Sequence, residues 1–160
     1  MELVVSPVNW TGTWDHTLFL GGGIQDCYNW QTDVIDAFRN TNIVLLNPRQ
    51  NEYDTTDQTL KLRQVSWEIK HFNLAGAIMF WFPQNCLCRT TNAEYGKWVL
   101  SGLAFNRGKK VFVGVHPNYI GAVDIRLQTQ LGSFSRNVVI ESSLDVLIKK
   151  TMDSYQKEGW

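Results

Sequence analysis

The sequence predicts an α/β fold: a single compact domain with a mainly parallel sheet of five strands and helices on both faces. Two observations favour this class. Short apolar runs rich in β-branched and aromatic residues alternate with segments in which apolar residues recur every three or four positions. The chain also has 160 residues without a repeat, linker or low-complexity segment, which is most simply one folding unit. Such alternation predicts a doubly wound sheet, as in Rossmann-like and flavodoxin-like folds.

Each expected element follows from its own pattern. Short, mainly apolar runs predict strands at residues 16–21, 43–46, 77–82, 110–115 and 138–140. Helices are expected at 30–40, from a cap anywhere in residues 54–57 to Phe72, from about Ala93 to a closing Gly108, and at 144–155. Residues 1–15 match no element, and we interpret them as an N-terminal extension of a domain that spans 1–160.

The helix after Asp57 carries two stripes of side chains. Leu62, Val65, Ile69 and Phe72 recur at steps of three and four residues, which predicts the apolar face of an amphipathic helix. Gln64, Glu68 and His71 fall on a different stripe at the same spacing.

Composition excludes several classes of partner. Fifteen Lys and Arg balance fifteen Asp and Glu, and no basic run is interleaved with aromatic residues, so a nucleic-acid groove is not expected. The uncharged stretch 72–88 is interrupted by polar residues, glycine and proline, and its pure apolar run is too short to cross a membrane. The first residues lack the basic flank of a signal peptide. A small-molecule ligand and a cytoplasmic location are therefore expected.

The three cysteines predict neither a metal site nor a disulfide framework. Cys27, Cys86 and Cys88 are odd in number, and their spacing with three isolated histidines matches no zinc pattern. Buried thiols in a reducing compartment are expected instead, with no metal and no cofactor. A nucleophilic Cys86 or Cys88 is a weak alternative, because neither has a neighbouring histidine in the sequence.

Three glycines, 21–23, follow the first expected strand directly. Without a Cβ they allow the backbone to approach a ligand closely, although a tight turn from strand to helix explains them equally well. A dinucleotide fingerprint is not present, because Asp26 stands at the third glycine position and the second strand ends in Asn47 rather than an acid.

Glu94 stands in the segment TTNAEYG, residues 90–96, after the strongly apolar strand that ends at Pro83. Because ligands of open α/β sheets bind beyond the carboxyl ends of the strands, Glu94 is expected to overlook a crevice and to suit the role of nucleophile. The alternative is a capping box, in which Thr91 and Glu94 satisfy backbone N–H groups at the start of a helix.

A series of short motifs gives this chain its resemblance to a known family. The motifs are LFLGGGI at 18–24, NWQ at 29–31, LNPR at 46–49 with Tyr53-Asp54, QVSWEI at 64–69, IMFWFP at 78–83 and AEYG at 93–96. In order and spacing they resemble the nucleoside 2-deoxyribosyltransferase-like proteins, over roughly residues 17 to 140. The resemblance implies a doubly wound domain, a nucleoside and a free nucleobase as substrates, and Glu94 as the nucleophile.

The implied chemistry is similar to that of retaining glycosidases. Glu94 would attack the anomeric carbon, the protonated base would leave, and a second base would displace the glycosyl-enzyme ester. Glu68 and Asp124 are the acids implied near the pocket, one holding sugar hydroxyls and the other protonating the base, in an order left open. Alternatively, Glu68 is a solvated helix charge and Asp124 the N-cap of a short helix around Ile125. Implied substrate-binding residues are Gly22, Gly23, Ile24, Asn47, Arg49, Tyr53, Trp67 and Asn92.

Other residues bear on which base and which sugar are recognised. Tyr53 and Trp30 are candidates to stack on a base, although Trp30 also suits the core. The better-known transferases carry an acidic residue in the loop before the nucleophile helix, whereas residues 84–90 contain none, so sugar recognition is expected to differ. Arg49 and Arg89 are candidate anion contacts, which would suit a nucleoside 5'-monophosphate, or else ordinary surface arginines.

The resemblance further implies a homo-oligomer with the pocket near a subunit interface. Two other functions stay open beside the transferase. One is an N-glycosidase of the same fold, which hydrolyses a nucleoside or a nucleoside 5'-monophosphate. The other is a nucleotide-binding module without catalysis.

Overall fold

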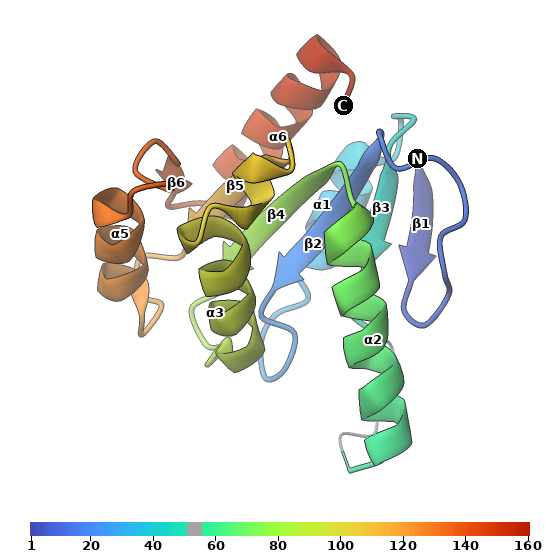
Figure 1. The fold of residues 1–160 in the computed structure, drawn as a ribbon, viewed down its shortest axis with the longest axis horizontal. Coiled ribbons are helices and arrows are strands. Elements are labelled where there is room, and N and C mark those ends of the chain that lie inside the picture. The colour runs from blue at the N-terminus through green and yellow to red at the C-terminus, as the bar shows by residue number, and fades with distance from the viewer. Residues whose placement is uncertain (51–55) are drawn as a thin grey trace.

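A computed structural model describes residues 1–50 and 56–160 and shows a parallel sheet in the order β1-β3-β2-β4-β5-β6 (Figure 1). The strands are β1 (Glu2–Val5), β2 (Thr17–Gly22), β3 (Val44–Asn47), β4 (Ala77–Phe82), β5 (Lys110–Val115) and β6 (Ile140–Glu141). The helices are α1 (Gln31–Phe38), α2 (Gln58–Leu74), α3 (Arg89–Tyr95), the π-helical turn η1 (Gly96–Leu100), α4 (Leu103–Asn106), α5 (Ala122–Leu131) and α6 (Leu144–Glu158). The α/β class and the parallel sheet are confirmed.

The sheet has six strands rather than five, because the N-terminal segment supplies an edge strand. Residues 2–5 pair in parallel with β3, with Val4 opposite Leu46. Only Val4 of this strand is fully buried, so its sequence lacks the long apolar run that marks the central strands. The interpretation of residues 1–15 as an extension without an element is therefore wrong for this part.

Apolar layers cover both faces of the sheet, as a doubly wound fold requires. On one face Phe19, Phe80 and Phe82 pack beneath Phe72 of α2 and Trp98 of η1. On the other face Leu20 and Met79 belong to a cluster with side chains of α1 and α6: Val34, Phe38, Leu147 and Ile148. The central strands β2 and β4 are buried along their whole length, which explains their unbroken apolar sequences.

The expected apolar face of α2 does not point to the core. Leu62, Val65 and Ile69 are 68%, 41% and 50% exposed, whereas Gln64 and His71 of the polar stripe are buried. The inner face is built instead by Trp67 and Phe72 together with polar side chains that find hydrogen-bond partners in neighbouring segments. The prediction for this helix is wrong because partners elsewhere in the chain satisfy the polar stripe.

The helix that carries Glu94 begins at Arg89, earlier than expected, after Cys88 in a left-handed conformation with φ of 48°. Thr91 and Glu94 both lie inside α3, so the capping-box interpretation is wrong. The helix does not run on to Gly108, because η1 and the left-handed Gly102 separate α3 from α4. Similarly, α5 begins at Ala122 with Gly121 as its N-cap, so Asp124 is not a capping residue.

Candidate active site

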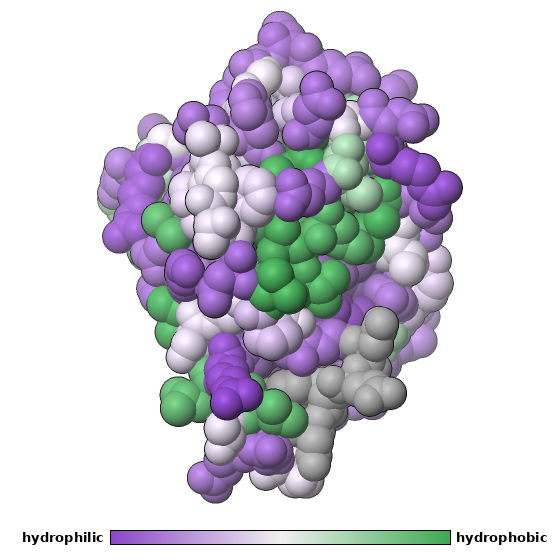
Figure 2. All heavy atoms as spheres, turned by 90° about the vertical axis from the view of Figure 1, so that its right-hand side faces the viewer, coloured by the Kyte–Doolittle hydropathy of each residue, from purple (hydrophilic) through white to green (hydrophobic). Residues whose placement is uncertain are grey.

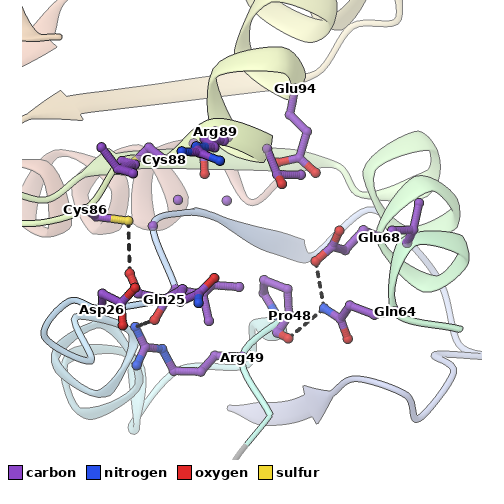
Figure 3. Close-up of a pocket in the computed structure, with 18 of the residues that line it drawn as sticks. Gln25, Asp26, Pro48, Arg49, Gln64, Glu68, Cys86, Cys88, Arg89 and Glu94 are labelled. Carbon is purple, nitrogen blue, oxygen red and sulfur yellow. Dashed lines mark hydrogen bonds between the residues drawn. The ribbon is translucent and has the colours of Figure 1, made fainter. Parts of the chain in front are cut away.

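A cavity of about 780 Å³ lies at the carboxyl ends of β2, β3 and β4 (Figure 3). Glycines 21–23 and residues 24–26 line it after β2, and residues 48–50 line it after β3. Two helices form further walls, with Lys61, Gln64, Val65 and Glu68 from α2 and Arg89, Thr90, Thr91 and Glu94 from α3. This is the position at which open α/β sheets bind ligands.

The glycine turn at this edge is tight and also lines the cavity. A Cβ on Gly22 would lie 2.4 Å from the backbone oxygen of Trp81, and one on Gly23 would lie 2.5 Å from Cys86 Sγ. A side chain on Gly22 would therefore collide with β4 itself, and one on Gly23 with the segment that follows β4. The glycine run therefore has both predicted features: it forms a close turn, and the same backbone is a wall of the cavity.

Glu94 and Glu68 reach the cavity from different helices, as Figure 3 shows. Burial, together with the charge of Glu68, raises the pKa of Glu94 to about 8. Burial also raises the pKa of Glu68, opposed by a hydrogen bond of 2.7 Å from Gln64 Nε2. Two like charges in a shared low-dielectric site disfavour each other, so Glu94 keeps a proton at neutral pH.

The side-chain carboxyl group of Glu94 makes no hydrogen bond or ion pair with the described residues. Among residues 1–50 and 56–160, none donates a hydrogen bond to it, and its side chain points into the cavity (Figure 3). Ion pairs and caps normally hold a half-buried carboxylate of structural importance. The arrangement is instead that of a group available to a ligand.

Arg49 lies at the cavity wall but is partly committed to structure. Its Nη2 donates to the Ile24 carbonyl at 2.6 Å, which ties the segment after β3 to the loop after β2. Its backbone N–H donates to Asn47 Oδ1 at 3.0 Å. Asn47 is thus a buried turn residue at the end of β3 that does not itself line the cavity.

The structure brings some predicted site residues together and not others. Glu94, Glu68, Gly22, Gly23, Ile24, Arg49 and Arg89 line the cavity. Trp67, Asn92, Asp124 and Asn47 are not among its lining residues; Tyr53 lies outside the described part of the chain.

Each residue away from the cavity has another environment. Trp67 is buried and donates a hydrogen bond from Nε1 to the Val8 carbonyl. Trp30 is fully buried and donates a hydrogen bond from Nε1 to the Gly23 carbonyl. The core interpretation of Trp30 is therefore confirmed. Asn92 is exposed and donates to Tyr119 Oη at 3.0 Å. Asp124 is exposed on α5, whereas Glu68 is the acid whose charge raises the pKa of Glu94.

Three further residues that line the cavity were not predicted from the sequence: Gln64, Gln50 and Lys61. For Gln64 a signal existed, because it precedes Glu68 by one helical turn on the same stripe. That stripe faces inward only because the partners of its polar groups lie far away in sequence, which no local pattern reveals.

The chain matches a known family over most of its length. The profile of the family described as nucleoside 2-deoxyribosyltransferase like matches residues 15–119, well over half of the chain. The chain belongs to this nucleoside 2-deoxyribosyltransferase-like family. No protein of curated function matches it. The family segment contains both cavity glutamates, whereas β1, α5 and α6 lie outside it.

In the described part of this family member, none of the helices is long and apolar enough to cross a membrane. No group of three or more histidine, cysteine or acidic side chains in residues 1–50 and 56–160 is arranged to hold a metal ion.

Proposed function

We propose that this protein transfers a 2-deoxyribosyl group between nucleobases through an ester on Glu94. The observation that carries the proposal is the pair of glutamates on two helices around one cavity, where burial raises the pKa of both carboxyl groups. Double displacement at an anomeric carbon needs a carboxylate nucleophile and a second group that carries a proton. The family match supports the same class of chemistry.

Each step can be assigned to one of the two side chains. An oxygen of the Glu94 carboxylate attacks C1' while the C1'–N bond breaks, and Glu68 gives its proton to the departing base. An acceptor base then attacks C1' from the vacated side, the ester bond breaks, and Glu68 takes the proton of the acceptor. Glu94 also balances the positive charge that develops on the sugar.

In the free protein Glu94 holds a proton at neutral pH, because burial raises its pKa to about 8. The reactive arrangement has the proton on Glu68 instead. When a sugar beside Glu94 develops positive charge, this charge stabilises the ionised form of Glu94. The proton of Glu94 then shifts toward Glu68.

Base exchange should therefore be fastest below about pH 8 and decline above it, since Glu94 has then lost the proton that this mechanism passes to Glu68 and the departing base. Glu68→Gln should lose this alkaline decline. The measurement is kcat/KM across pH for a 2'-deoxynucleoside with a second free base. A rate that keeps rising above pH 8 in the wild type would contradict the role of Glu68.

The same assay separates transfer from the alternatives. A transferase releases little base until an acceptor is present, whereas an N-glycosidase releases base at the same rate without one. Lys61 and Arg89 also line the cavity, which favours including 2'-deoxynucleoside 5'-monophosphates in the substrate panel. Binding of a nucleoside without turnover would show a binding module and overturn the proposal.

We also propose that two copies of the chain associate through the side formed by β1 and α2. This side carries an apolar patch (Figure 2), and exposed apolar side chains on these elements include Leu3, Leu62, Val65 and Ile69. β1 pairs with β3 alone among the described strands, and open edges of sheets are normally covered. Because Val65 also lines the cavity, the second copy would lie beside the site.

Leu62→Lys is expected to convert a dimer into a monomer, because it places a charge in the apolar contact. Light scattering after size-exclusion chromatography measures the change. The control is Leu131→Lys on α5, on the opposite side of the molecule, where the side chain is 80% exposed (Figure 1). A monomeric wild type, or dissociation by Leu131→Lys alone, would contradict this interface.

A further inference from the structure

The segment between β1 and β2 begins with five residues, Ser6–Trp10, that run along α2 and bond to its side chains; we call it the N-terminal strap. Four hydrogen bonds join it to α2: Ser6 Oγ to Gln64 Oε1 (2.6 Å), Trp67 Nε1 to the Val8 carbonyl (2.7 Å), Lys70 Nζ to Asn9 Oδ1 (3.0 Å) and Trp10 N–H to His71 Nε2 (3.3 Å). The strap lies outside the segment that matches the family, residues 15–119.

The first of these bonds leads directly to the cavity. Gln64 Oε1 accepts from Ser6 Oγ and from Gln50 Nε2, while Gln64 Nε2 donates to the Pro48 carbonyl at 2.9 Å and to Glu68 Oε1 at 2.7 Å. A carbonyl can only accept and an amide nitrogen can only donate. The amide of Gln64 can therefore satisfy these partners in one orientation alone, with an N–H directed at Glu68 (Figure 3).

We propose that the N-terminal strap is a positioning element of the site, in which Ser6 fixes the Gln64 amide and Gln64 holds the Glu68 carboxyl at the cavity. Its importance for catalysis rests on the proposed function, where Glu68 carries the proton. Ser6 and Gln64 touch no reacting atom in that mechanism and act through Glu68.

The consequence is electrostatic. A hydrogen bond from a neutral donor stabilises the carboxylate more than the carboxylic acid, so the Gln64 bond opposes the effect of burial on the pKa of Glu68. If the amide rotates or is removed, that pKa rises. Other charged groups that line the same cavity are Glu94 and Arg89 from α3, Lys61 from α2, Arg49 after β3 and Asp26 after β2. Substitutions in the strap leave all of them in place.

The test is a titration of the Glu68 carboxyl by carbon NMR on the full chain, with the resonance assigned through Glu68→Gln. Gln64→Met removes the donor and should raise the pKa of Glu68 by about one unit. Ser6→Ala should raise it by a smaller amount, and Ser6→Thr, which keeps the hydroxyl, should restore the wild-type value. Asn9→Ala is the matched control, because it cuts the strap's bond to Lys70 without touching Gln64.

An unchanged Glu68 titration in Ser6→Ala would overturn the positioning role. An equal rise in Asn9→Ala would overturn it too, since the strap would then act only through the general stability of α2. Ser6→Ala and Ser6→Thr decide the matter even if Gln64→Met does not fold. If the expected pKa changes occur but the wild type exchanges no base, the proposed function fails while the positioning of Glu68 holds.

Discussion

Glu94→Gln is expected to bind a 2'-deoxynucleoside and to lose base exchange by several orders of magnitude, the usual consequence of removing a nucleophile. The neutral amide can neither form the ester with C1' nor balance the charge on the sugar. Because none of the described residues bonds to the Glu94 carboxylate, the substitution breaks no structural contact found there. Exchange is followed by separating the two nucleosides, and binding by calorimetry.

The matched control for this substitution is Asp153→Asn, which makes the same chemical change at an exposed position on α6. It should keep wild-type exchange. Near-normal exchange by Glu94→Gln would show that Glu94 is no nucleophile, whatever its place in the cavity.

The second large effect concerns stability. In the folded protein the pKa of Glu94 is about 8, against an ordinary value of 4.5. Below pH 4.5 both the folded and the unfolded chain hold this proton; between pH 4.5 and 8 only the folded chain does; above pH 8 neither does. The Glu94 contribution to the free energy of unfolding therefore falls as the pH rises from 4.5 to 8 and is constant above that.

Glu94→Gln removes this dependence, so the variant should become progressively more stable than the wild type across that range. The difference should reach a few kcal/mol, because each unit of pKa shift corresponds to about 1.4 kcal/mol. Urea unfolding at several pH values measures it. A stability difference that does not change between pH 5 and 8 would show that the carboxyl is solvated, contrary to its raised pKa.

The parts predicted best from the sequence are those fixed by local burial. β4 and β5 have the bounds expected from their apolar runs, since central strands of a parallel sheet are covered on both faces. β1 could not be recognised, because an edge strand of four residues is stabilised by its pairing with β3 rather than by its own pattern.

The candidate site was predicted in part for a similar reason. The glycine turn and Glu94 follow strands closely, so the topology alone brings them to one edge of the sheet. Gln64 required knowledge of Ser6 and Pro48, which approach it from distant parts of the chain. The apolar stripe of α2 faces outward for the same reason. Polar residues can occupy the inner face of this helix, because partners from distant parts of the chain satisfy their hydrogen bonds.

The most direct test of the central claim is mass spectrometry of the wild type quenched during turnover of a 2'-deoxynucleoside without an acceptor base. We expect one deoxyribosyl adduct on the peptide that contains Glu94, and none on the corresponding peptide of Glu94→Gln. An adduct on Cys86 or Cys88, or an adduct that persists in Glu94→Gln, would contradict the assignment of Glu94 as the nucleophile.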